Sequence, residues 1–323
     1  KTFFLSTAPV EFTNTASSSA LSNGVPCGNE STATKKLSNN MINKIGMSQG
    51  FKNSSGETVY TTYNHKDHTT KWRTTINENR ITLTDVRAVE TLPEGSSLDK
   101  ISVINIYKAD DSILYRITST DGNDFLINGE PAAATEVDGG YALTLPNGQV
   151  ITWKETKGTK YAENTSTEIS NNTLELTFSD PVSYKVEYEF YTKYDESYRK
   201  EVAANRKIVS LAVVNVYGKY DGEDIISMRK SNAISILPYV IEKKGWYNEK
   251  RGTITWTLYV NQDHINLQDY SVVENLRNEF EMDFSTFHVS TFDVSPIGER
   301  SDFIDVTDDF MGSLIENGTR GFE

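Results

Sequence analysis

The stretch Ser183–Tyr191 reads S-Y-K-V-E-Y-E-F-Y, and Thr253–Val260 reads T-I-T-W-T-L-Y-V. In both stretches apolar or aromatic residues alternate with polar ones, which is typical of strands with one buried face and one exposed face. Dipeptides that favour two-residue hairpin turns recur between such runs, for example Asn23-Gly24 and Asp221-Gly222. The best candidate for a helix is one short segment, Glu196–Lys207. The sequence therefore predicts an all-β protein built from sandwiches.

The composition excludes several classes of partner and site. The 323 residues carry 45 acidic and 32 basic side chains, a net charge of −13, so we expect neither a nucleic acid nor an anionic membrane as the main partner. The single cysteine, Cys27, excludes an internal disulfide framework, and we place it in a connector, Ser17–Ser31. Four scattered histidines predict no metal site, and no motif indicates a cofactor.

An internal repeat organises the chain. Trp72–Asp99 matches Trp256–Asp283 at a constant offset of 184 residues, and nine of the 28 aligned positions are identical. A Lys-x-Gly motif precedes each of the two stretches, so an ordered Lys–Trp–Glu set occurs twice. From the N-terminus onward, the two sets consist of Lys44, Trp72 and Glu90, then of Lys243, Trp256 and Glu274.

A weaker repeat relates two Asn-bearing strands, F-T-N-T-A at Phe12–Ala16 and V-V-N-V-Y at Val213–Tyr217. The spacing supports the match, because Asn14 precedes the first Lys-x-Gly lysine by 30 residues and Asn215 precedes the second by 28. We therefore expect three parts. They are residues 1–35, the last strands of a split module; residues 36–237, a complete module with extra edge strands inserted at 108–165; and residues 238–323, the first part of another split module.

The ordered motifs resemble a known family. Lys-x-Gly, W-x-x-x-x-N, an acid before T-L-P and the Asn-bearing strand are similar to the immunoglobulin-like modules of Gram-positive surface proteins. That family includes collagen-binding adhesins and related pilin modules, and the resemblance covers both repeats but not the insertion. It implies immunoglobulin-like β-sandwiches and an extracellular location on the bacterial cell surface. It also implies a self-formed isopeptide bond between a lysine on an early strand and an asparagine on a late strand, assisted by a buried acid.

The family roles can be carried over to particular residues. In the complete module the nucleophile, the acid and the electrophile would be Lys44, Glu90 and Asn215. In the split module the same roles would fall to Lys243, Glu274 and Asn14. Asn205 is the alternative to Asn215, because it lies about as far after the Y-x-T strand as the bonding asparagine does in the collagen-binding modules that this chain resembles. Asn215 is favoured because it lies within a strand and keeps the spacing of the repeat. The acid is glutamate at both places, where the family more often has aspartate.

These residue types suit the chemistry. Amide formation needs a neutral amine, and burial lowers the pKa of a lysine while it raises the pKa of a carboxylic acid. A protonated glutamate can donate to the amide carbonyl and pass a proton to the departing ammonia. The reaction would occur once per bond, so we predict single-turnover autocatalysis and no enzyme.

Two functions from different classes follow from this interpretation. The first is a structural subunit of an extracellular fibre or pilus whose partners are copies of itself. The terminal segments would join head to tail by strand complementation, and isopeptide bonds would seal the joints. The alternative is a segment of a multi-module surface adhesin that binds collagen or another host matrix protein.

Overall fold

The computed structural model describes residues 10–37, 41–158, 171–203, 208–236, 241–267, 271–277, 279–311 and 321–322. The chain divides into two compact units, each assembled from segments that are separate in the sequence. The first unit comprises Lys1–Gly46, Trp72–Thr192 and Leu211–Asn232, and the second comprises Met47–Lys71, Lys193–Ser210 and Ala233–Glu323. Most of the predicted complete module therefore falls in the first unit.

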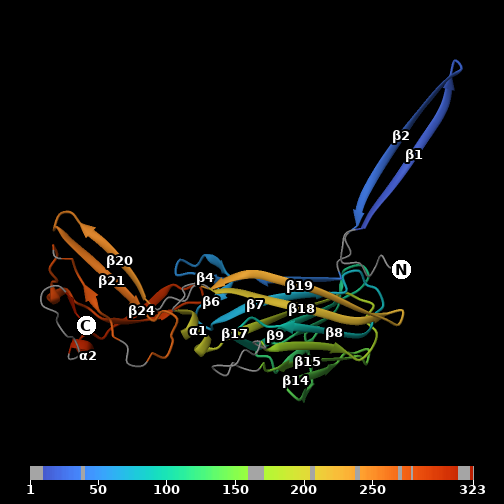
Figure 1. Ribbon diagram of the computed structural model, residues 1–323. Helices are drawn as coiled ribbons and strands as arrows, with labels where there is room; N and C mark the ends of the chain where they lie inside the picture. The colour runs from blue at the N-terminus through green and yellow to red at the C-terminus, as the bar shows by residue number, and fades with distance from the viewer. Residues whose placement is uncertain are drawn as a thin grey trace, which may run out of the picture. The chain divides into compact units, whose positions relative to one another are not determined.

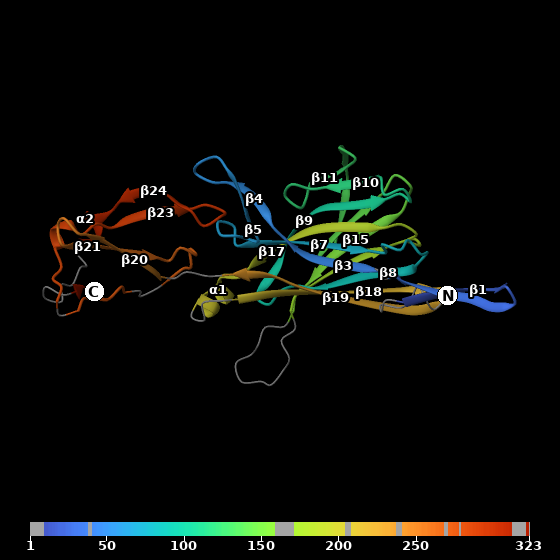
Figure 2. The ribbon, with the colours of Figure 1, turned by 90° about the horizontal axis from the view of Figure 1, so that it is seen from above.

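Two large β-sheets organise the predicted complete module (Figures 1 and 2). One sheet has the strand order β12-β11-β10-β9-β17-β7-β3, with β6 paired to β7 off this path. Its strands are β3 (Ile42–Met47), β6 (Tyr63–Asn64), β7 (Thr69–Ile76), β9 (Ser96–Tyr107), β10 (Ile113–Thr118), β11 (Phe125–Ile127), β12 (Glu130–Ala132) and β17 (Val186–Tyr194).

The other sheet has the order β13-β14-β15-β16-β8-β18-β19. Its strands are β8 (Thr84–Thr91), β13 (Ala134–Val137), β14 (Gly140–Thr144), β15 (Val150–Thr156), β16 (Thr173–Phe178), β18 (Ile208–Tyr220) and β19 (Glu223–Ile236). The strands from β13 to β8 and then β18 pair antiparallel with their neighbours.

The core lies between the two sheets. Along β16, buried and half-buried side chains alternate strictly, as expected of a strand with one face turned inward. The largest fully buried side chains include Trp72 on β7 and Tyr188 and Phe190 on β17. Burial of such aromatic side chains supplies much of the free energy that holds two sheets together. The predicted class, an all-β immunoglobulin-like sandwich, is confirmed.

The predicted insertion at 108–165 adds strands to both sheets. Strands β10 to β12 extend the edge of the first sheet, and β13 to β15 extend the edge of the second. Phe125, Tyr141 and Trp153 form an aromatic cluster within the insertion, with ring centroids 5.1 to 6.1 Å apart. Residues 159–170 lie outside the described part of the chain.

The N-terminal segment forms a long hairpin of β1 (Val10–Ser22) and β2 (Val25–Leu37). Asn23 and Gly24 make its turn with φ of 50° and 81°, the positive values that a two-residue turn of this kind requires. Cys27 therefore lies on a strand instead of in a connector. Every described side chain from Thr13 to Thr34 is exposed, and an isolated two-stranded hairpin is marginally stable in water.

The second unit is built from short antiparallel strand pairs. They are β4 (Gln49–Lys52) with β5 (Thr58–Thr61), β20 (Ile241–Asn248) with β21 (Thr253–Val260), β22 (Glu274–Asn275) with β25 (Gly321–Phe322), and β23 (Ser290–Val294) with β24 (Arg300–Asp305). Its helical elements are α1 (Glu196–Ala203), α2 (Thr307–Met311) and the 3₁₀ turn η2 (Phe284–Thr286). The predicted helix 196–207 is confirmed as far as Ala203, and residues 204–207 lie outside the described chain.

The internal repeat is also a repeat of local structure. After β7, Asn77 adopts φ of 54° and its side-chain amide donates to the carbonyl of Ile81 over 2.9 Å. After β21, Asn261 adopts φ of 57° and donates to the carbonyl of Ile265 over 2.8 Å. The isoleucine is buried in both loops. The W-x-x-x-x-N motif thus ends a strand and folds the following loop onto the core.

Candidate functional site

The first Lys–Trp–Glu set lies in the core of the sandwich. Lys44 projects from β3 and Glu90 from β8, so the pair bridges the two sheets. The Lys44 Nζ lies 2.7 Å from the Glu90 Oε2, and the two side chains are 0% and 1% exposed. An ion pair so fully removed from water is stable only when hydrogen bonds satisfy its remaining polar atoms.

Two hydroxyl groups complete this network. The Thr74 Oγ1 accepts a hydrogen bond from the Lys44 Nζ at 3.1 Å and donates to the Glu90 Oε1 at 2.5 Å. The Tyr188 hydroxyl donates to the same carboxylate oxygen at 2.7 Å. Neither residue was predicted from the sequence. Thr74 lies two positions after the repeat tryptophan, and Tyr188 lies within the alternating run Ser183–Tyr191, so the alternation placed it on a strand without indicating a polar role.

Two aromatic rings lie beside the ammonium group of Lys44. The Lys44 Nζ lies 4.6 Å from the centre of the Phe190 ring and 5.5 Å from that of Trp72, distances suited to cation–π attraction. Burial lowers the pKa of Lys44, although the charge of Glu90 opposes this shift. Burial and the same carboxylate raise the pKa of the Tyr188 hydroxyl, which therefore remains a donor. Proton transfer from Lys44 to Glu90 would generate the neutral amine that a nucleophile needs.

The second set is assembled from the same residue types in a more open environment. The Lys243 Nζ on β20 lies 2.6 Å from the Glu274 Oε1 on β22, with side chains 37% and 9% exposed. The same nitrogen lies 4.5 Å from the centre of the Trp256 ring on β21. The predicted Lys–Trp–Glu groups therefore come together twice, once in a closed core and once beside solvent.

The Lys-x-Gly motif has a steric reason in the second set. Gly245 lies opposite Trp256 in the hairpin, and a Cβ at this position would come within 2.4 Å of the indole ring. The glycine therefore lets the ring lie across the backbone next to Lys243. Leu258 lies opposite Lys243 and corresponds in the repeat to Thr74, so this set lacks the hydroxyl that links lysine and carboxylate in the first.

The structure does not bring Asn215 to the first set. In the antiparallel pair of β18 and β8, Val214 lies opposite Glu90 and Asn215 lies opposite Val89. Val214 and Val216 are buried while Asn215 is only half-buried, so the Asn215 side chain lies on the outer face of the sheet. Asn14 lies on β1 with its side chain exposed. The alternative, Asn205, lies outside the described residues.

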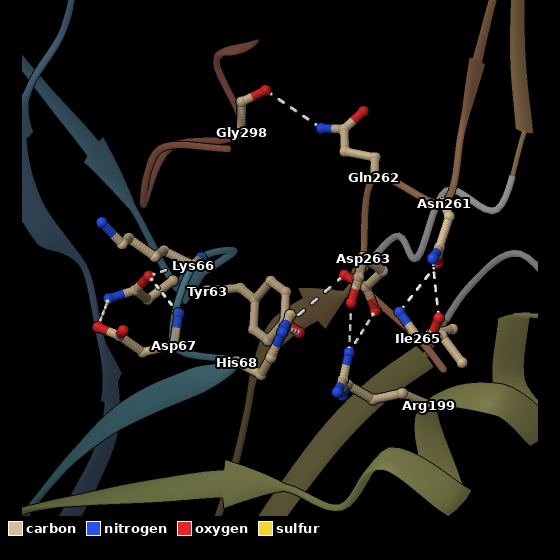
Figure 3. A network of polar contacts seen from close by, with 11 residues as sticks. Tyr63, Lys66, Asp67, His68, Arg199, Asn261, Gln262, Asp263, Ile265 and Gly298 are labelled. Carbon is tan, nitrogen blue, oxygen red and sulfur yellow. Dashed lines mark hydrogen bonds and ion pairs between the residues drawn. The ribbon is translucent and has the colours of Figure 1, made fainter. Parts of the chain in front are cut away.

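A separate polar network holds loops of the second unit together (Figure 3). The His68 Nδ1 lies 3.0 Å from the Tyr63 hydroxyl and 3.9 Å from the Asp263 Oδ1, and the Arg199 Nη1 lies 3.5 Å from the Asp263 Oδ2. Burial, together with the nearby positive charge of Arg199, lowers the pKa of His68 to about 3. Burial raises the pKa of Asp263. Within the described residues no group of three or more potential ligands is placed to hold a metal ion.

No protein-family model matches the sequence, and the search of curated proteins gives no match. Among solved structures, the chain is similar to the collagen-binding subdomain of the Enterococcus faecalis surface protein ACE, with 10% identity, 59% of this chain and 94% of that chain covered, and a TM-score of 0.30. It is similar to the collagen-binding domain of a Staphylococcus aureus adhesin, with 10% identity, coverage of 61% and 99%, and a TM-score of 0.29.

A 35 kDa C-terminal fragment of the major pilin of Streptococcus agalactiae is also similar, with 9% identity, coverage of 66% and 61%, and a TM-score of 0.27. At such values the function of this chain has to be argued from its own residues. Among the helices in the described ranges, none is long and apolar enough to cross a membrane.

Proposed function

We propose that the protein is a structural subunit of an extracellular bacterial fibre, of the general adhesin and pilin kind, in which chains join head to tail. The observation that carries this proposal is the second Lys–Glu pair, which is already in contact but lies beside an uncovered apolar sheet face. In the first unit the equivalent pair is sealed by a second layer of strands. The second unit has the reactive groups without that cover, as expected of a site that a further strand completes.

The uncovered face belongs to the β20–β21 hairpin. The register places one set of side chains on the face of Lys243, namely Ile241, Tyr247, Ile254, Trp256, Leu258 and Val260. Tyr247 is 56% exposed and Trp256 is 45% exposed, and Ile241 is exposed as well. On the opposite face the guanidinium of Arg300 lies 3.6 Å from the centre of the Tyr259 ring, whereas Trp246 is 65% exposed. Apolar surface of this kind favours association.

The covalent step would join Lys243 to Asn14 of a second copy. The neutral Lys243 Nζ attacks the side-chain carbonyl carbon of Asn14, a new N–C bond forms, and the bond from that carbon to the amide nitrogen breaks. Glu274, in its protonated form, donates to the carbonyl oxygen and then relays the proton lost by the amine to the leaving ammonia. One amide replaces another, so no oxidant or energy source is needed, and proximity supplies much of the rate.

We do not extend the proposed bond to Lys44 and Asn215. The half-buried, outward side chain of Asn215 lies on the face of β18 opposite to Val214, which is the residue that neighbours Glu90. An amide at Asn215 could reach Lys44 only if the strand changed its register by an odd number of residues. The first pair therefore serves as a structural ion pair within the subunit.

Denaturing gel electrophoresis of the concentrated wild-type protein tests the proposal. We expect a ladder of multimers that survives boiling in detergent and reducing agent. Lys243→Ala and Asn14→Ala should each abolish the ladder, while the matched variant Lys244→Ala, one residue away on the opposite face, should keep it. A wild-type chain that stays monomeric at high concentration would contradict the fibre and favour a surface adhesin that binds a host matrix protein.

A further inference from the structure

Two hairpins of the molecule have the same construction. The β1 and β2 strands contain 13 residues each, and β18 and β19 contain 13 and 14. Two-residue turns join them, Asn23-Gly24 with φ of 50° and 81° and Asp221-Gly222 with φ of 52° and 84°. In both cases a Lys-x-Gly lysine follows the end of the second strand by seven residues. The β1–β2 hairpin is therefore the counterpart of β18–β19.

The β18–β19 hairpin has a defined place in the first unit. Strand β18 pairs with β8, where Val214 lies opposite Glu90. Strand β19 contacts β3, the strand that carries Lys44. Arg229 donates to the carbonyl of Ile42 over 3.1 Å, and the Ser231 hydroxyl accepts from the amide of Gly46 over 3.0 Å. One hairpin thus covers the strand of the glutamate and the strand of the lysine together.

Alignment of the two turns shows which residues of β1 correspond to the buried ones of β18. Asn14 takes the place of Ala212, Ala16 that of Val214, and Ser18 that of Val216, all three of which are buried in the first unit. Between Asn14 and Ala20 the corresponding face of β1 therefore carries only small side chains. The side chains of Asn14, Ala16 and Ser18 are exposed, although their counterparts Ala212, Val214 and Val216 form part of a core.

The second unit offers a matching acceptor. Strand β22 carries Glu274 and has β25 as its neighbour on one edge in the part of the chain that the structure describes. Beside it lies the uncovered β20–β21 face with the exposed rings of Tyr247 and Trp256. Small side chains on one layer accommodate large rings on the facing layer, which is how sandwich cores reach high packing density.

We propose that the β1–β2 hairpin of one copy docks as a single unit on the second unit of another copy, with β1 paired to β22 so that Ala16 lies opposite Glu274. This inference rests on the proposed function and specifies how two copies join. Each copy donates two strands, and the pairing of β1 with β22 has one register. Asn14 then lies on the inner face, two residues along the strand from Ala16. The equivalent place in the first unit is taken by Ala212, which has no amide to react.

Engineered disulfides test the register. In the proposed pairing Thr15 lies opposite Asn275, as Val213 lies opposite Thr91 in the first unit, and opposite residues of an antiparallel pair are within disulfide reach. The double variant Thr15→Cys, Asn275→Cys is made in a Cys27→Ser, Lys243→Ala background, so that no amide bond can form. Mild oxidation of the full chain should yield multimers that a reducing agent converts back to monomers.

A matched pair reports the rival register. Alignment of Asn14 with Asn215, as in the sequence repeat, would place Asn14 opposite Val273. The variant Asn14→Cys, Val273→Cys in the same background should therefore stay monomeric. Multimers from this pair, or none from either pair, would overturn the inference. If the wild-type protein forms boiling-resistant multimers while Thr15→Cys, Asn275→Cys forms none, the fibre proposal survives and the hairpin register is wrong. Reducible multimers without any wild-type amide ladder would support the docking and contradict the covalent seal.

Discussion

The two Lys–Trp–Glu sets of this molecule differ in their surroundings far more than in their residues. Around Lys44 and Glu90 the structure supplies two hydroxyl donors, two aromatic walls and complete exclusion of water. Around Lys243 and Glu274 it supplies one indole ring and an open face. The distance between lysine and carboxylate is nearly the same, 2.7 Å and 2.6 Å.

The motif therefore determines which groups meet, whereas the second layer of strands determines how strongly they interact. A charge pair in water contributes little to stability, because solvent screens it. In a dry core the stability of the same pair depends on its hydrogen-bond partners, because an unpaired buried charge is strongly destabilising.

The largest effect is expected from removal of the buried carboxylate. Glu90→Ala leaves the Lys44 charge buried without its partner, which should lower the free energy of unfolding by about 3–5 kcal/mol. The matched variant Glu274→Ala, at the open set, should cost less than about 1 kcal/mol. Denaturant unfolding followed by circular dichroism measures both. Equal losses from the two variants would show that the second set is as enclosed as the first.

A smaller effect is expected from removal of one donor. Tyr188→Phe keeps the ring but removes the hydroxyl that donates to Glu90, and hydrogen bonds to charged groups contribute about 1.5–3 kcal/mol. The control Tyr60→Phe removes the hydroxyl of a tyrosine whose side chain is 72% exposed. Its unfolding free energy should stay close to the wild-type value. A neutral Tyr188→Phe would mean that water reaches the carboxylate.

Acid should weaken the second unit through His68. Its pKa is lowered to about 3 in the folded protein, from an ordinary value of 6.5. Between these values the unfolded chain binds a proton that the folded chain does not, so stability is full above about 6.5 and is lost as the pH falls towards about 3. The raised pKa of Asp263 acts in the opposite sense. Urea midpoints measured across this window should depend less on pH in His68→Gln, and an unchanged slope would contradict the assignment.

The smallest effect concerns Asn215. Because its side chain lies on the outer face of β18, Asn215→Ala should change the intact mass of the monomer only by the difference between the two side chains. Its free energy of unfolding should stay within about 0.5 kcal/mol of the wild-type value, the range typical of surface substitutions. Mass spectrometry of the wild-type monomer should show no loss of ammonia. A monomer lighter by one ammonia, with the loss abolished by Asn215→Ala, would restore the bond that the sequence predicts.

Much of the architecture could be predicted from the sequence. The period-two alternation around Tyr188 identified the strands, and the dipeptides Asn23-Gly24 and Asp221-Gly222 marked hairpin turns that the structure shows with the expected positive φ values. The helix at Glu196 was also located. These features depend on neighbouring residues in the chain, and local sequence reports them directly.

The repeat also predicted which lysines and glutamates come together, because it preserves their order and spacing around Trp72 and Trp256. The tertiary structure was needed to show that Asn215 lies on the face of β18 turned away from Lys44 and Glu90. Successive residues of a strand point to opposite faces, so a shift of three residues between Asn215 and the turn-aligned position Ala212 exchanges the inner and outer faces. Spacing along the chain does not show which face of β18 a residue lies on. That face depends on the register of β18, which the partner strand β8 and the turn at Asp221-Gly222 set.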